Sequence, residues 1–357
     1  AHVSTESAAR DLDILRGLVG DKKLNYLGFS YGTSLGGMYA NLFPKKAGRL
    51  VLDGAVDPQL GDARMGYEQI VGFETAFQHY AQHCVDTGRC PLGGSVDEAR
   101  AKMKALFDQA LKSPFPTANP NRPLNRTALY STVISMMYRE LYWTYLDRGL
   151  SQLVEQNNGS VILGYHDLFE ERQGNKFKNN GKEAFWAINC ADYVPSPRAE
   201  YQQYADKLRT EAPVFGSSMM EGTDICSLWP YHPKANPGPY EAKGSAPIVV
   251  IGTKHDPATP YSWAQNMHKT LENSVLLTWE GDGHLAYRRA GSCIKAPVDK
   301  YLLTGEVPKD GLVCPVEKPQ GQEAQKQGQE AQKEGVSDRK VSVKDEVLAG
   351  KSCPFVR

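Results

Sequence analysis

Apolar positions near the start of the chain recur first at helical and then at strand spacing. Residues 4–19 carry them three or four positions apart, which predicts an amphipathic helix capped by Ser4 or Thr5. Its apolar stripe consists of Leu12, Leu15, Leu18 and Val19. Residues 23–29 (KLNYLGF) and 49–56 (RLVLDGAV) are short apolar runs that predict strands, with helical spacing between them. A strand, a helix and a strand in this order predict a parallel sheet.

The pattern changes between residues 61 and 244, where helical spacing dominates and aromatic residues are dense. Aromatic side chains at helical spacing more often fill a core than a ligand site. The densest group consists of Tyr138, Tyr142, Trp143 and Tyr145. We interpret this block as a helical cap.

Strand patterns return at residues 246–252 (APIVVIG) and 274–279 (SVLLTW). A helix over residues 262–271 is expected between them, with Thr259 as its N-cap and Pro260 at its first position. The sheet core is therefore expected at residues 1–60 and 245–316, split by the helical cap at residues 61–244. Residues 317–357 contain QGQEAQK twice in succession, with Ala as the only apolar member, and predict a disordered polar tail.

Charge and cysteine content narrow the possible environments. Lys+Arg and Asp+Glu are equal at 41 each, so nothing in the charge balance favours nucleic acid as a partner. No run of 18 apolar residues predicts a membrane span. Six of the seven cysteines fall into sequential pairs, which favours disulfides in an exported protein over buried thiols in a cytosolic one. The expected pairs are Cys84–Cys90, Cys190–Cys226 and Cys293–Cys314, with Cys353 left over.

The motif with the clearest chemistry is Gly28-Phe29-Ser30-Tyr31-Gly32, a G-x-S-x-G sequence. It lies at the end of a predicted strand and the start of a predicted helix. Small residues on both sides let the chain turn sharply and lift the Ser30 hydroxyl out of the sheet edge. The backbone N–H of Tyr31 would then face a developing oxyanion, helped by the helix dipole. Ser30 is our candidate nucleophile, and the alternative is a tight turn without catalytic function.

A serine nucleophile needs a base and an acid that orients the base. Asp256 follows the strand pattern at 246–252, and His284 follows the one at 274–279, so both are expected at the same sheet edge as Ser30. His284 is the candidate base and Asp256 the candidate acid. His255 and Asp282 are rivals: His255 has no later acid in the required order, and Asp282 would share a turn with the histidine that it must orient.

A metal site was the competing possibility. His79 and His83 lie four residues apart on a predicted helix, and Cys84 and Cys90 are near. The residue after His79 is Tyr80 rather than Glu, so the metalloprotease motif is absent. We favour an exposed cap helix beside a disulfide, and we expect neither a metal ion nor a cofactor.

Several segments together resemble the secreted bacterial tripeptidyl aminopeptidases, which are α/β-hydrolase peptidases related to prolyl aminopeptidase. The matching segments are LGFSYGTSLGGMY at 27–39, VLDGAVDP at 51–58, NCADY at 189–193, PIVVIGTKHDPATP at 247–260 and GDGH at 281–284. The resemblance covers roughly residues 4–316 and implies an α/β-hydrolase core with a helical cap, export, and removal of short peptides from a free N-terminus. By the resemblance, Ser30, Asp256 and His284 form a catalytic triad that hydrolyses peptide substrates.

The resemblance also implies a segment before the first helix, holding the first strands of the sheet and a Gly-rich loop with the second oxyanion donor. This chain is expected to hold the C-terminal half of that sheet, to self-associate, and to show little or no activity without the missing segment as a partner. An esterase with the same triad and a catalytically dead binding protein are the alternatives. The substrate amine could be bound by a cap carboxylate, with Glu170, Glu171, Asp192 and Glu221 as candidates.

Overall fold

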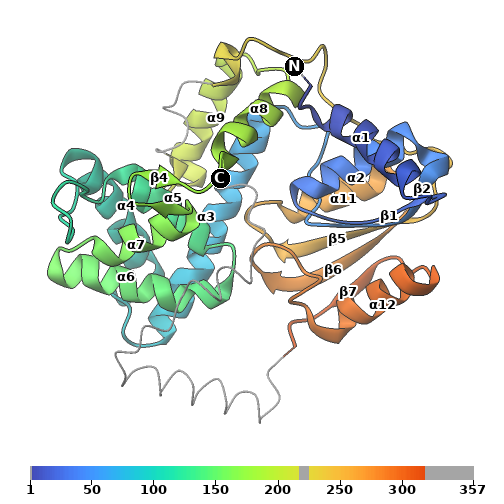
Figure 1. The fold of residues 1–357 in the computed structure, drawn as a ribbon. Coiled ribbons are helices and arrows are strands. Elements are labelled where there is room, and N and C mark those ends of the chain that lie inside the picture. The colour runs from blue at the N-terminus through green and yellow to red at the C-terminus, as the bar shows by residue number, and fades with distance from the viewer. Residues whose placement is uncertain (1, 217–224, 318–357) are drawn as a thin grey trace.

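A parallel sheet lies beside a helical region in the computed structural model, which describes residues 2–216 and 225–317 (Figure 1). The sheet order is β1-β2-β5-β6-β7, and every neighbouring pair is parallel. Its strands are β1 (Leu24–Phe29), β2 (Ala47–Asp53), β5 (Ile248–His255), β6 (Ser274–Asp282) and β7 (Leu312–Cys314). This topology confirms the predicted α/β-hydrolase core with a mostly parallel sheet.

Helices cover both faces of the sheet (Figure 1). One face packs against α1 (Thr5–Leu18), α2 (Tyr31–Leu42) and α11 (Tyr261–Thr270), and the other against α12 (Gly291–Thr304). Neighbouring strand residues alternate between the two cores, since Leu50 and Leu52 join the first and Val51 joins the second. Parallel strands covered on both faces carry near-continuous apolar runs, and this explains the runs seen in the sequence.

The chain between β2 and β5 is mostly helical and forms its own apolar core. Its helices are α3 (Asp62–Asp86), α4 (Val96–Lys112), α5 (Arg126–Met136), α6 (Trp143–Gln156), α7 (Ser160–Phe169), α8 (Gly181–Asp192) and α9 (Arg198–Glu211). Its shorter elements are η2 (Glu140–Tyr142), η3 (Cys226–Leu228) and the hairpin of β3 (Arg172–Gln173) and β4 (Lys176–Phe177), while η1 (Pro44–Lys46) precedes β2. Tyr138, Tyr142 and Trp143 are buried in this core, as expected for packing side chains.

Three details differ from the sequence interpretation. β5 and β6 run on to His255 and Asp282, beyond the apolar runs that predicted them. The short β7 was not predicted at all. Thr259 is not the cap of α11, because its hydroxyl donates to Asp256 and Pro260 takes the N-cap position.

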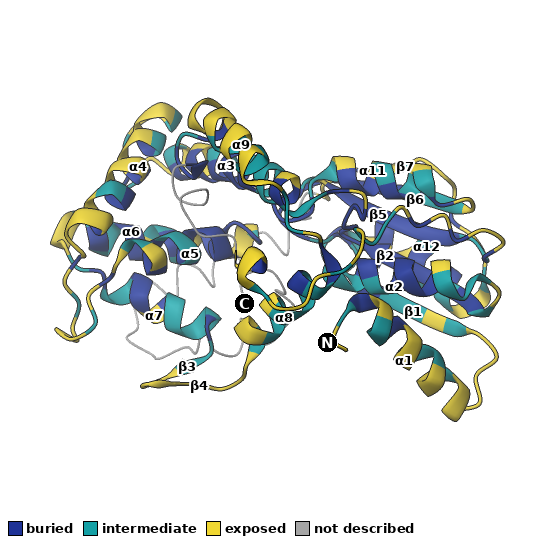
Figure 2. Cartoon of the chain, turned by 90° about the horizontal axis from the view of Figure 1, so that it is seen from above, coloured by how far each residue is buried: buried dark blue, intermediate teal, exposed yellow. Residues whose placement is uncertain are grey.

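The C-terminal half of α1 carries apolar side chains that face solvent, and Figure 2 shows much of this helix exposed. Ser4 caps this helix by accepting the N–H of Ser7, as one of the two predicted caps. Leu12 packs against the core, but the rest of the predicted stripe does not. Relative exposure is 61% for Ile14, 56% for Leu15, 77% for Leu18 and 73% for Val19. Within the described residues β1 pairs with β2 alone, so an open strand edge adjoins this apolar surface.

We expect the chain to self-associate through α1 and the open edge of β1. Exposed apolar side chains beside an unpaired strand edge favour association. The double substitution Leu15→Glu and Leu18→Glu should shift the chain towards monomer in sedimentation equilibrium. Because both side chains are exposed, stability should change by less than about 0.5 kcal/mol. Leu303→Glu on α12 is the matched control, since Leu303 is 78% exposed on the opposite face of the sheet. Equal association in the double variant and the control would contradict this assignment.

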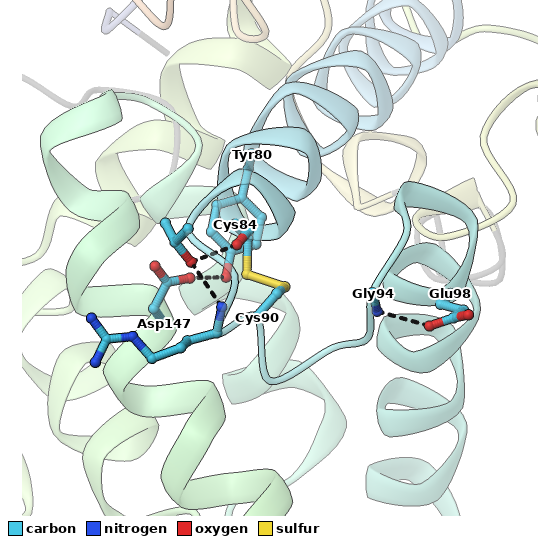
Figure 3. The surroundings of a disulfide bond; sticks show 8 residues. Tyr80, Cys84, Cys90, Gly94, Glu98 and Asp147 are labelled. Atoms are coloured by element: carbon cyan, nitrogen blue, oxygen red, sulfur yellow. Dashed lines mark hydrogen bonds between the residues drawn. A yellow bond between two sulfur atoms is a disulfide. The ribbon is translucent and has the colours of Figure 1, made fainter.

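Three disulfides join the predicted cysteine pairs: Cys84–Cys90, Cys190–Cys226 and Cys293–Cys314. Figure 3 shows the first, where Cys84 on α3 bonds to Cys90 beside the hydrogen bond from the Tyr80 hydroxyl to Asp147, 2.7 Å long. The cysteines of the competing metal site are therefore used in a disulfide, and this excludes the ligand set of His79, His83, Cys84 and Cys90.

Loss of the Cys190–Cys226 disulfide should destabilise the chain more than loss of Cys84–Cys90. The sequence separations are 36 and 6 residues, and a longer closed loop costs the unfolded chain more entropy. The double Cys→Ser variants should lose about 4 and about 2 kcal/mol respectively on the chain-entropy model. Urea unfolding followed by circular dichroism measures both. The reverse order would show that native-state strain, rather than loop closure, governs these bonds.

No helix within residues 2–216 and 225–317 is long and apolar enough to cross a membrane. The predicted polar tail after Glu317, with Cys353, lies outside the described residues.

Candidate functional site

Ser30 occupies a sharp turn between β1 and α2. Its backbone has φ 53° and ψ −122°, in the region that side chains other than glycine rarely adopt. The close contact between strand and helix explains the glycines of the motif. A Cβ on Gly28 would lie 2.5 Å from the Gly32 carbonyl oxygen, and the Tyr26 hydroxyl donates to that same oxygen at 2.7 Å. The local sequence therefore forms the strained turn typical of a nucleophile elbow.

The Ser30 hydroxyl is not used by the surrounding structure. The Ser30 N–H donates to the Asp53 carbonyl at 2.9 Å, and the Ser30 carbonyl accepts from Thr33. The side chain does not cap α2. Ser30 Oγ is buried and has no hydrogen-bond partner among the described residues. A buried hydroxyl without a partner costs stability, and such sites are typical of reactive groups.

His284 is paired with Asp256 through its Nδ1 atom. The distances from Nδ1 to Asp256 Oδ2 and Oδ1 are 2.9 and 3.0 Å, and both side chains are buried. Asp256 also accepts the N–H groups of Ala258 and Thr259 and the hydroxyl of Thr259. Carboxylates held in this way fix the orientation of the imidazole and its tautomer. His284 Nε2, the atom that would face a nucleophile, is buried and has no partner in the described part of the chain.

Gly54 lies between the histidine and the serine turn. It follows Asp53, whose carbonyl binds the Ser30 N–H. A Cβ on Gly54, at φ 69°, would lie 3.2 Å from His284 Cε1 and 3.1 Å from Thr259 Oγ1. The structure thus brings Ser30, Asp256 and His284 to one edge of the sheet. Before substrate binds, the hydrogen bond between nucleophile and base is often long or absent, and two free buried atoms fit that situation.

Asp53 supports this arrangement and was not singled out from the sequence. Its carboxylate is fully buried at the end of β2 and accepts the N–H groups of Ala286 at 3.1 Å and Tyr287 at 2.9 Å. Burial raises the pKa of Asp53 to about 6, while these two N–H groups lower it. Asp53 therefore holds the loop that follows His284. An aspartate that ends an apolar strand run was the available signal.

Tyr31 is the first residue of α2, where backbone N–H groups have no acceptor within the helix. Its side chain begins a hydrogen-bonded chain: Tyr31 and Thr5 hydroxyls are 2.6 Å apart, and the Thr5 hydroxyl donates to Asp192 at 2.5 Å. Thr5, Tyr31, Asp192 and Ser34 line a small pocket of about 10 Å³. Burial raises the pKa of Asp192, whereas the hydrogen bonds from Thr5 lower it.

The other candidate amine-binding carboxylates have different surroundings. Glu170 forms an ion pair with Lys182 at 2.7 Å, and Glu171 accepts from Asn179. Glu221 lies outside the described residues. Of the three candidates that the structure describes, only Asp192 lines the pocket that Tyr31 also lines.

Comparison with known proteins agrees with this geometry. A family model described as "TAP-like protein" matches residues 212–314. The serine protease Hip1 of Mycobacterium tuberculosis is 35% identical over 325 residues, which cover 88% of this chain and 62% of that protein. The chain is therefore similar to TAP-like proteins over residues 212–314 and to this serine protease over most of its own length. This confirms the resemblance that the sequence motifs predicted.

Two further relatives differ in their names. Carboxylesterase B of M. tuberculosis is 33% identical over 318 residues, covering 88% of this chain and 61% of that protein. The tripeptidyl aminopeptidase of Streptomyces lividans is 27% identical over 318 residues, covering 88% and 58%. The chain thus spans about three fifths of the length of these relatives. The names of the three relatives support a serine hydrolase. Two of them name peptidases and one names a carboxylesterase, so the names do not decide between peptide and ester substrates.

Proposed function

We propose that this chain provides the catalytic triad of a serine exopeptidase, with Ser30 as nucleophile, His284 as base and Asp256 as orienting acid. The observation that carries the proposal is the pairing of His284 Nδ1 with the buried Asp256, while His284 Nε2 and Ser30 Oγ have no hydrogen-bond partner among the residues that the structure describes. Asp53 and Thr259 act as positioning residues, because they hold the histidine loop and the acid rather than the substrate.

In the proposed reaction Ser30 Oγ attacks the scissile carbonyl while His284 Nε2 takes the hydroxyl proton. The negative charge that develops on the carbonyl oxygen is stabilised by the Tyr31 N–H and the N-terminus of α2. His284 then gives its proton to the leaving amine, which leaves an acyl group on Ser30. His284 next deprotonates a water molecule that attacks the acyl group, and Ser30 recovers its proton as the peptide acid departs.

A preference for a free N-terminus is part of the proposal. The tripeptidyl aminopeptidase relative supports it, and so does the pocket that Asp192 shares with Tyr31. In this proposal Asp192 faces the substrate ammonium group, since a buried carboxylate beside the nucleophile turn is the matching charge. Loss of a hydrogen bond to a charged group typically costs about 1.5–3 kcal/mol.

Labelling with a fluorophosphonate probe tests the triad directly. Mass spectrometry of the labelled protein should locate the adduct on Ser30, because only an activated serine reacts at an appreciable rate. Prior heat denaturation is the control and should abolish labelling. An unlabelled native chain would favour the catalytically dead binding protein instead.

A panel of three fluorogenic substrates tests the specificity. A tripeptide amide with a free amine should be cleaved about 10- to 100-fold faster in kcat/KM than its N-acetylated form, from the lost charged contact. A short acyl ester is the third member. If the ester is cleaved and neither peptide is, the chain is an esterase, which is the alternative that the carboxylesterase relative supports.

We also propose that the protein acts outside the cytoplasm. Three disulfides within the described residues are compatible with an oxidising compartment and unusual in a reducing one.

A further inference from the structure

Three side chains from separate elements meet where the helical region contacts the sheet edge. His79 comes from α3, His255 from the end of β5 and Asp282 from the end of β6. One ligand-type atom from each residue lies within 4.8 Å of the other two, and all three residues are partly buried. His255 and Asp282 were considered above only as rivals for the triad, and His79 only with His83 and the cysteines.

The sheet register and α3 fix this cluster. β5 and β6 are parallel neighbours, and their pairing sets His255 opposite Asp282. His79 reaches across from α3, where its Nδ1 forms a hydrogen bond with Asp282 Oδ1. The rings of His79 and His255 are 4.7 Å apart between centroids and meet edge to face at 74°. The fold therefore brings the donor-bearing side chains of three separate elements together.

Contacts elsewhere along α3 hold the helix against the same edge. A Cβ on Gly72 would lie 2.7 Å from the Pro257 carbonyl oxygen, and Gln69 Nε2 donates to the Ala258 carbonyl at 2.7 Å. His79 lies roughly two helical turns beyond Gly72, on the same side of the helix. This close docking on the loop after Asp256 keeps His79 over the strand ends.

We propose that His79, His255 and Asp282 form a binding site for one zinc-class divalent transition-metal ion. Two imidazole nitrogens and one carboxylate oxygen are ligands that Zn²⁺ prefers, and three protein ligands leave a position for water. Magnesium and calcium prefer sites made of oxygen atoms, so two imidazoles disfavour them. Glu140 adds negative charge near Asp282, whereas Arg289 and Lys254 are nearby cations that oppose metal binding.

The site has a structural role in this proposal and takes no part in the acyl-transfer steps. His255 immediately precedes Asp256, and Asp282 precedes His284 by two residues. A bound ion would tie α3 to the two strand ends that carry the acid and the base. It would stabilise the folded chain by an amount that grows with the logarithm of the free ion concentration above the dissociation constant, because the unfolded chain lacks the assembled ligands.

Isothermal titration of the metal-stripped full-length chain with Zn²⁺ tests the site. We expect one ion per chain and a rise in melting temperature on loading. His79→Gln and His255→Gln should each weaken binding at least about tenfold, while keeping side chains that suit a half-exposed surface. His83→Gln is the matched control: it lies on the same helix as His79, and its ring packs against Trp143.

Co²⁺ substitution gives a second measurement that does not depend on the variants. The visible absorption of bound Co²⁺ should show four or five nitrogen and oxygen ligands and should fall in His79→Gln. Zn²⁺ affinity that is equal in His79→Gln, His255→Gln and His83→Gln would overturn the proposal. So would a melting temperature that falls in His79→Gln by the same amount with and without Zn²⁺, because the cluster would then be an ion pair only.

Discussion

Ser30→Ala should abolish both fluorophosphonate labelling and peptide turnover while leaving the fold intact. Loss of one triad member typically lowers kcat by about 10⁴- to 10⁶-fold. Stability should not fall, because alanine keeps the Cβ at φ 53° and removes a hydroxyl that has no partner among the described residues. Relief of that unpaired buried group should stabilise the chain by about 1 kcal/mol. Probe labelling and peptide-hydrolysis assays on the variant and the unaltered chain measure the loss of activity. Urea unfolding of the same two proteins measures the change in stability.

The control for this variant is Ser151→Ala on α6, which removes a hydroxyl far along the chain from the site. This variant should react with the fluorophosphonate probe and hydrolyse the peptide substrate at the rates of the unaltered chain. An adduct that persists in Ser30→Ala would show that a different side chain reacts with the probe, and the assignment of the nucleophile would be wrong.

Asp256→Asn should lower kcat by about 10⁴-fold with little change in KM. The carboxylate faces the His284 ring nitrogen, the N–H groups of Ala258 and Thr259, and the hydroxyl of Thr259. The amide NH₂ of asparagine is a donor and would face groups that are themselves donors, so these hydrogen bonds would be lost. It would also favour the tautomer of His284 in which Nδ1 is the acceptor. Stability should also fall, by about 1–3 kcal/mol for the buried groups left unpaired. Steady-state kinetics on the best peptide substrate and urea unfolding are the measurements.

Asp97→Asn is the matched control, because the Asp97 side chain is 95% exposed on α4. It should leave kcat and stability unchanged. If Asp256→Asn retains kcat within about tenfold, another carboxylate must orient the histidine.

The sequence was most informative where local chemistry and local structure coincide. Gly28 and Gly32 on either side of Ser30, directly after an apolar strand run, are enough to predict the turn and the parallel strand. Asp256 and His284 could be placed by the same reasoning, because residues that follow parallel strands gather at one edge of the sheet. Sequential cysteine pairs led to the disulfides for the simple reason that short loops close easily.

Features that depend on distant contacts were missed. Asp53 acts through Ala286 and Tyr287, far along the chain, so its place at a strand end could not by itself assign that role. Thr259 was predicted as a helix cap, and its hydrogen bond to Asp256 depends on a loop conformation that the sequence pattern does not specify. β7 has three residues and is a strand only because β6 accepts it as a neighbour. The exposed stripe of α1 has the spacing of a buried face, and periodicity alone cannot tell whether a covering partner is present. His79 meets His255 and Asp282 only once α3 has docked.

One contact described by the structure joins the helical region to the proposed base itself. The His284 N–H donates to the Tyr138 carbonyl at 2.8 Å, and the rings of these residues meet edge to face, with centroids 5.3 Å apart. A Cβ on Gly283 would lie 2.6 Å from that same carbonyl oxygen. The helical region is therefore not an exchangeable module. Its outer helices can vary more readily than this contact. A helical region transplanted from another protein would have to reproduce the backbone position of Tyr138. In recombination between relatives, crossover points that keep Tyr138 and His284 from the same parent should therefore be favoured.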